Sequence, residues 1–301
     1  MKSMARAQQP EPVQVGTPQW IEDEVQRYLR TGEYDGCFVG WPGANCVDAA
    51  IRATQHLRAT LVAQTMLRSD GLQCSVCIPD DLHAWSSNRL RPMVDGLFDA
   101  RERTAVLNVL ANSIVFLTPA NLAEVLMKER WLSTAWDVSN IYLESLETPA
   151  LSELARNIVG LSQETTCYVS MAYFRETDPF ADFVVHEAAH VFHNCKRATA
   201  GLGKRPHSDY LLDIDHGMRE MFAWACETWS RISSVASNSS EREVLLEQHA
   251  EYGLPSDDRV DHDEYLDILA EAARARNGWQ RILTRCTPAR RRKGATRCRE
   301  E

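Results

Sequence analysis

Two histidines and a glutamate stand inside an otherwise apolar segment, which reads FVVHEAAHVF over residues 183–192. An apolar segment of this kind is typical of a buried helix, and Asp178-Pro179 provides a helix start shortly before it. Ionisable side chains on a buried helix need partners, because burial without them is costly. The fold of this chain must therefore supply partners for His186, Glu187 and His190.

The spacing of the three side chains favours a metal site. His186 and His190 lie on one face of the predicted helix, one turn apart, where two imidazoles can bind the same tetrahedral metal ion. Glu187 is offset by about 100° around the helix. From there it can reach a water molecule at the open coordination position and take its proton. The pattern predicts a zinc site with Glu187 as general base.

A hydrolytic zinc site also needs a third protein ligand. Glu220 and Glu227 are the candidates, because both lie in a helix predicted over 215–235 and, seven residues apart, share one of its faces. We favour Glu220, since the small Ala223 three positions on lets the two helices pack closely. Glu227 is then either a residue that orients a ligand or a surface acid. Asp215 is expected to cap this helix.

These residues resemble the zincin superfamily of metallopeptidases, in its gluzincin pattern of His-Glu-x-x-His followed by a glutamate on a later helix. The likeness covers residues 165–235. It implies that Zn²⁺ is bound by His186, His190 and Glu220. It also implies that a strand predicted over 165–174 forms a sheet edge that aligns an extended substrate.

Related enzymes place a donor for the oxyanion of the tetrahedral intermediate between the two ligand-bearing helices. His207, Tyr210 and His216 occupy that part of the sequence, and we name His207 and Tyr210 as candidate catalytic residues. An ordinary loop position is the alternative for each of them. His193, three residues after His190, can touch the metal or simply end the helix.

The amino-acid composition restricts the classes of partner and the cellular locations that fit the chain. Apolar residues make up 44% of the 301, which is enough for a sizeable core, and a formal charge of −9 disfavours nucleic-acid binding. Neither a signal peptide nor a membrane-spanning segment is predicted. Nine cysteines, an odd number, fit free thiols in a reducing cytoplasm. An effector exported without a cleaved signal peptide fits as well.

We expect a protein or peptide substrate, no nucleic acid and no membrane; the oligomeric state is not indicated.

The predicted fold is α+β and mostly helical, with a zincin-like core that combines a small sheet with the histidine-bearing helix. Further strands are predicted at 74–79 and 113–117, and helices at 97–110, 119–132 and 150–161. The predicted organisation is a disordered leader 1–17, a helical N-terminal subdomain 18–150, a zincin-like metallopeptidase core 151–288 and a basic tail 289–301.

The function expected from these observations is zinc-dependent hydrolysis of peptide bonds. An alternative is a zincin-fold regulatory or effector protein that acts on one specific protein partner with little general protease activity. A third possibility is a helical protein in which the His-Glu-x-x-His spacing is accidental.

Overall fold

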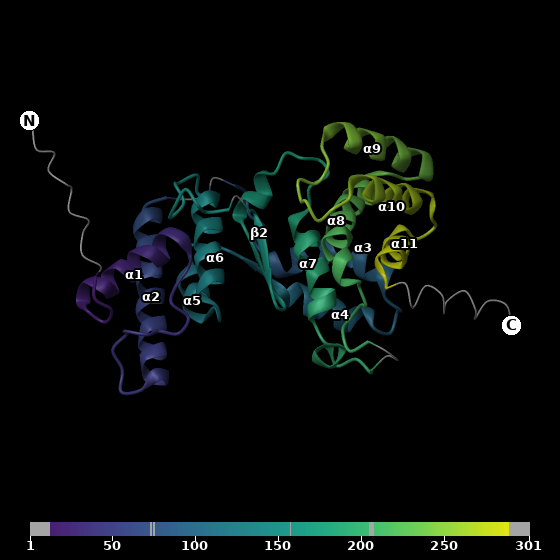
Figure 1. Cartoon of the computed structure of the whole chain (residues 1–301). Coiled ribbons are helices and arrows are strands. Elements are labelled where there is room, and N and C mark those ends of the chain that lie inside the picture. The colour runs from purple at the N-terminus through teal and green to yellow at the C-terminus, as the bar shows by residue number, and fades with distance from the viewer. Residues whose placement is uncertain (1–12, 73, 75, 157, 205–207, 289–301) are drawn as a thin grey trace, which may run out of the picture. The chain divides into compact units, whose positions relative to one another are not determined.

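The computed structural model describes residues 13–72, 74, 76–156, 158–204 and 208–288. Most of the predicted leader, the basic tail 289–301 and His207 lie outside these residues. The described part contains eleven α-helices, three short 3-10 helices and one three-stranded sheet (Figure 1). The fold is therefore α+β and mostly helical, as the sequence predicts.

The chain divides into two compact units. One consists of residues 1–73 and 119–157, and the other of residues 74–118 and 158–301. Residues 74–118, which the predicted boundary near 150 groups with the N-terminal half, thus pack in the unit that carries the two histidines.

The first unit is built from four helices: α1 (Pro18–Thr31), α2 (Cys46–Ser69), α5 (Leu122–Lys128) and α6 (Leu132–Ser145). The helix predicted over 119–132 is wrong as one element, because the chain leaves the helix at Glu129 and α6 begins at Leu132. The Glu129 carboxylate accepts a hydrogen bond from the main-chain N–H of Trp131 (3.1 Å), which stabilises this break.

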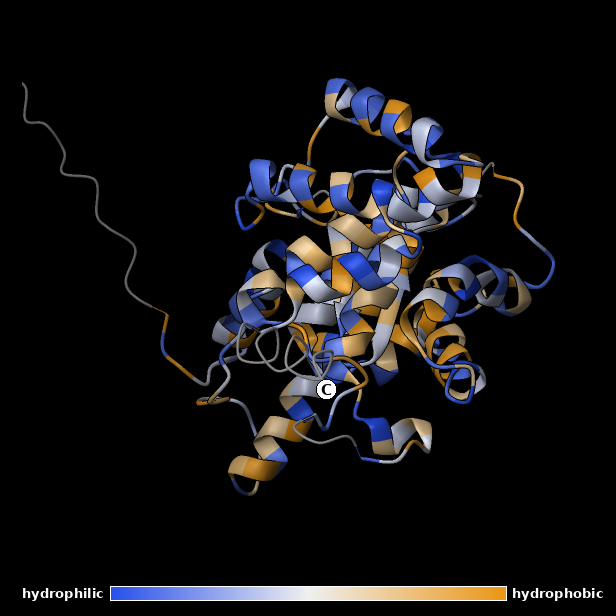
Figure 2. Cartoon of the chain, turned by 90° about the vertical axis from the view of Figure 1, so that its right-hand side faces the viewer, coloured by the Kyte–Doolittle hydropathy of each residue, from blue (hydrophilic) through white to orange (hydrophobic). Residues whose placement is uncertain are grey.

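The second unit contains seven α-helices that share one hydrophobic core. They are α3 (Leu82–Leu97), α4 (Arg103–Ser113), α7 (Phe183–Asn194), α8 (Arg219–Val235), α9 (Ser239–Tyr252), α10 (His262–Arg274) and α11 (Gly278–Cys286). Hydrophobic and hydrophilic residues alternate along the helices, as expected for amphipathic helices around a core (Figure 2). The sequence prediction missed α3, and the helix predicted over 97–110 is shifted to α4.

The sheet has the order β1-β3-β2. Strand β1 (Ile114–Phe116) runs parallel to β3 (Thr166–Val169), and β2 (Gly160–Gln163) runs antiparallel to β3 on its other side. The strand predicted at 165–174 is confirmed only over β3, and it is central rather than an edge. The two edges of the sheet are β1 and β2.

Two further predictions fail in this region. The helix predicted over 150–161 is wrong: the described residues 150–156 and 158–159 form no helix, and 160–163 form β2. Asn140 holds the start of the segment, since its Oδ1 accepts a hydrogen bond from the Leu151 N–H (2.8 Å). The strand predicted at 74–79 is also wrong over its described residues, 74 and 76–79.

Helix α7 packs against β2 and β3 on one side and lies beside α8 on the other (Figure 1). A 3-10 turn (His216–Met218) leads into α8, and Asp215 caps this turn by accepting a hydrogen bond from the Gly217 N–H (3.0 Å). Asp215 thus caps the start of this helical region, as predicted. The arrangement brings the first turn of α8 next to the centre of α7.

Candidate metal centre

Three side chains converge where α7 meets α8. His190 Nε2 lies 3.6 Å from Glu220 Oε2, and His186 Nε2 lies 4.0 Å from the same oxygen. One donor atom from each of the three residues lies within 4.8 Å of the other two. Two donors bound tetrahedrally to zinc at about 2.0–2.2 Å are roughly 3.4 Å apart, so a slight contraction of this group would suit the ion. Two imidazoles and a carboxylate are also the donor types that zinc prefers.

Glu227 lies on the opposite side of His186. Its Oε2 is 2.8 Å from His186 Nδ1, and its Oε1 accepts a hydrogen bond from the Asp182 N–H (2.7 Å). The carboxylate, which is only 1% exposed, can only accept, so Nδ1 is the donor. When His186 is neutral, its lone pair is therefore on Nε2, which faces Glu220. Glu227 fixes the tautomer that a metal ligand needs.

A buried ionic network anchors the N-terminal end of α7. Asp182 forms an ion pair with Arg89, and its two oxygens accept hydrogen bonds from Tyr173 Oη (3.0 Å) and Ser230 Oγ (2.9 Å). Asp182 is fully buried, so these partners compensate a charge that would otherwise be costly. Because the Asp182 N–H also binds Glu227, the network holds the residue that orients His186.

The two histidines have opposite pKa shifts. Burial lowers the pKa of His186, but the hydrogen bond and charge of Glu227 outweigh it and raise the value to about 9. Burial, with the charge of His186, lowers the pKa of His190 to about 2. His190 is thus unprotonated at neutral pH and can donate a nitrogen lone pair to a metal ion. At His186 a metal ion would have to displace a proton.

Glu187 is buried against the edge strand β2. Ser162 Oγ donates a hydrogen bond to Glu187 Oε2 (2.5 Å). A methyl group in place of the Gly160 hydrogen would lie 2.8 Å from both Cγ and Oε1 of Glu187, so no larger residue fits there without moving the carboxylate. Burial raises the pKa of Glu187, while the charge of His186 and the Ser162 hydrogen bond oppose this rise. The carboxyl group is held in one place and made more basic.

The other predicted residues do not join this group. His207 lies outside the described residues. Tyr210 pairs its backbone with Lys196 in an isolated bridge and has a side chain 41% exposed; in the described part of the chain it makes no hydrogen bond or ring contact with the three central residues. His193 is buried, with its ring edge-on to His190 (5.3 Å between centroids). It buttresses His190 without joining the donor group.

One residue that contributes to the site was not predicted from the sequence. Arg259 Nη1 lies 2.9 Å from Glu220 Oε1, and Asp257 binds the other side of the same guanidinium (2.6 Å). This ion pair leaves the second carboxylate oxygen of Glu220 directed at the histidines. Arg259 comes from the loop after α9 and is 39 residues downstream of Glu220 in the sequence, so no local pattern connects the two.

No protein-family model matches the chain, and searches of curated proteins and of solved structures found no match. None of the helices in the described part of the chain is both long and apolar enough to cross a membrane.

Proposed function

We propose that this chain is a zinc-dependent metallopeptidase with a zincin-like core. One observation carries the proposal: His186, His190 and Glu220 bring one donor atom each within 4.8 Å of the others. A zinc ion held by them would supply a Lewis acid that polarises a peptide carbonyl and makes a water molecule more acidic. A cytoplasmic location belongs to the proposal, supported by eight free cysteines among the described residues.

Glu187 is the general base in this mechanism. It takes the proton from the attacking water and passes it to the leaving amine. Its buried position raises its pKa, which makes it a stronger base, and Ser162 keeps its carboxylate from rotating away. The side chain also follows His186 directly on α7, on the side that faces β2.

The free edge of β2 would align the substrate. Strand β2 pairs with β3 only, within the described sheet, so its other edge is not covered by a described strand. An extended peptide can add to such an edge through main-chain hydrogen bonds. Gly160 and Ser162 lie on this strand and contact Glu187, so a peptide bound there would pass the general base.

The test compares metal content and peptide hydrolysis in three proteins. Wild type is expected to purify with one zinc ion per chain, His186→Ala to lose it, and Glu187→Gln to keep it without cleaving a fluorogenic peptide library. Mass spectrometry of the native protein measures the zinc. A metal-free wild type that takes up no added zinc would refute the proposal. Zinc binding with cleavage of one protein only, and none of casein, would favour the specific regulatory or effector role.

A further inference from the structure

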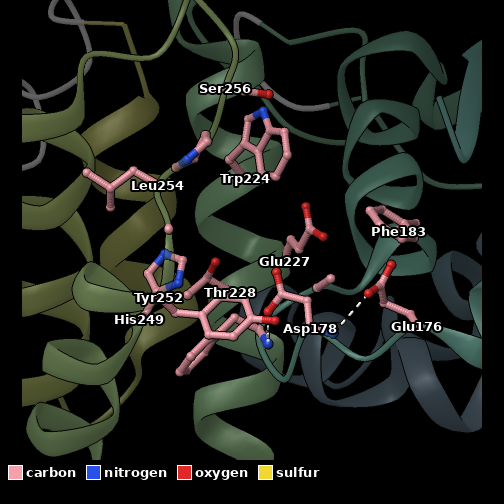
Figure 3. A pocket seen from close by; sticks show the side chains of 14 residues that line it. Glu176, Asp178, Phe183, Trp224, Glu227, Thr228, His249, Tyr252, Leu254 and Ser256 are labelled. Carbon is pink, nitrogen blue, oxygen red and sulfur yellow. Dashed lines mark hydrogen bonds between the residues drawn. The ribbon is translucent and has the colours of Figure 1, made fainter. Parts of the chain in front are cut away.

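A cavity of about 300 Å³ lies beside the metal centre (Figure 3). It is lined by residues 176–183 before and at the start of α7, by α8, by the end of α9 and by the loop 252–256. All of these belong to the second unit. The proposed zinc ligands and the general base Glu187 do not line the cavity.

The cavity and the metal centre share a wall. Trp224 and Glu227 line the cavity, and both also contact His186: the Trp224 ring is 4.8 Å from the imidazole, centroid to centroid, and Glu227 binds Nδ1. The loop that closes the cavity continues to Asp257 and Arg259. Asp257 pairs with Arg259, and Arg259 pairs with Glu220. A side chain in the cavity would therefore lie close to the group bound at the metal.

The cavity is acidic, because Glu176 and Asp178 belong to its lining. Glu176 accepts hydrogen bonds from the main-chain N–H groups of Thr177 (2.7 Å) and Asp178 (2.9 Å), and Asp178 accepts one from Phe180 (2.8 Å). Neither carboxylate forms an ion pair within the described part of the chain. These negative charges favour a cationic ligand.

A buried histidine in the same wall adds no positive charge to the cavity. His249 is 5% exposed, and its Nε2 lies 2.9 Å from Tyr265 Oη, but its Nδ1 has no hydrogen-bond partner among the described residues. Tyr265 Oη is also 2.7 Å from Thr228 Oγ1. Burial lowers the pKa of His249, so its imidazole is neutral at pH 7 and does not offset the charge of the two carboxylates.

Aromatic rings complete the lining. The Phe180 ring packs against His249 (4.8 Å between centroids) and Tyr252 (6.1 Å), and Trp224 lies on the side of His186. A guanidinium group suits such a site better than an ammonium, because it is planar, stacks on aromatic faces and offers five N–H donors.

We propose that this cavity binds an arginine side chain of the peptide substrate, close to the bond that is cleaved. The guanidinium would pair with Glu176 and Asp178 and lie against the aromatic part of the lining. The role of the cavity in substrate binding rests on the proposed metallopeptidase function; its affinity for a guanidinium does not.

The test titrates the full-length chain with Nα-acetyl-arginine amide and with its citrulline counterpart, which has nearly the same shape and no charge. We expect the citrulline compound to bind at least about tenfold more weakly, because its uncharged side chain cannot form ion pairs with the two carboxylates. In the double variant Glu176→Gln/Asp178→Asn the arginine compound should lose a similar factor, because both substitutions keep the oxygen that accepts from the main chain. Glu247→Gln, on the exposed side of α9, is the matched control.

Equal affinity for the two compounds, or an arginine affinity unchanged in the double variant, would overturn the inference. The comparison of compounds on wild type needs no variant to fold. The measurement also needs neither metal nor hydrolysis. Arginine binding by a protein that holds no zinc would sustain the cavity assignment and reject the proposed function, and zinc-dependent cleavage without arginine preference would do the reverse.

Discussion

Glu227 accepts a hydrogen bond from Nδ1 of His186 across 2.8 Å, and its second oxygen is bound to the main-chain N–H of Asp182. Both oxygens therefore face donors. The residue connects the start of α7 to the imidazole on the following turn, so the orientation of His186 is set by the backbone of its own helix as well as by α8. Glu227 stays close to the metal-binding group without offering it an oxygen.

Replacing Glu227 with glutamine should weaken zinc binding by about 10- to 100-fold, the usual effect of losing a partner that orients a ligand. The amide offers one acceptor where the site has two donors, so its NH₂ group must face either Asp182 N–H or His186 Nδ1. In the second case Nδ1 becomes the acceptor and the proton moves to Nε2, which blocks the metal-binding atom. Competition with a chromophoric chelator measures the affinity. Glu247→Gln should match wild type, and an unaltered affinity in Glu227→Gln would contradict this account.

Replacing Gly160 with alanine should separate metal binding from catalysis. The added methyl group would meet Cγ and Oε1 of Glu187 at 2.8 Å, so the carboxylate must move. A displacement of about 1 Å in a reacting group can lower the rate roughly 100-fold. We therefore expect kcat/KM to fall by up to about 100-fold, while the zinc content stays unchanged. Gly203→Ala is the control, because a methyl group there meets nothing within 4 Å. Full activity of Gly160→Ala would argue against Glu187 as the base.

The grouping of His186, His190 and Glu220 could be predicted because most of it is set by helical geometry. The relation of the two histidines is fixed within one helix, and Ala223 indicated where a second helix could approach closely. The structure places these side chains as that reasoning required. For Glu227 the sequence permits either a residue that orients a ligand or a surface acid, and its hydrogen bond to His186 Nδ1 favours the first.

The edge strand could not be found in the same way. Leu151, Leu154 and Ile158 recur at helical spacing, which favours a helix over 150–161. The segment instead follows its tertiary contacts: the Leu151 N–H binds Asn140, and Gly160 to Gln163 pair with β3. Arg259 could not be predicted for a related reason, because α8 and α9 separate it in the sequence from Glu220, with which it forms an ion pair.

Replacing Ser162 with alanine should shift the pH profile of hydrolysis. The Ser162 hydrogen bond opposes the rise that burial causes in the pKa of Glu187, so its removal raises this pKa further. Glu187 acts as a base only when ionised, and the acid limb of kcat/KM should therefore move to higher pH. Activity measured from pH 5 to 9 provides the profile. Ser237→Ala, on the exposed surface, should leave it in place, and an acid limb at lower pH in Ser162→Ala would contradict the assignment.

Acidification should destabilise the protein in part through His249. Burial lowers the pKa of this imidazole below its ordinary 6.5, and the charge of Asp178 only partly opposes the effect. The unfolded chain then binds a proton more readily than the folded chain does, so the stability that His249 contributes is present above pH 6.5 and is lost as the pH falls below it.

In His249→Gln this contribution is absent, and the free energy of unfolding should depend less on pH between 7.5 and 5. Urea denaturation at several pH values measures both proteins. The difference in stability between wild type and His249→Gln should shrink on acidification, even if the variant is less stable at every pH because its contacts with Tyr265 and Phe180 are altered. His83→Gln, at an exposed position of α3, should keep the pH dependence of wild type. Parallel curves for wild type and His249→Gln would show that the imidazole is as easily protonated in the folded chain as in the unfolded one.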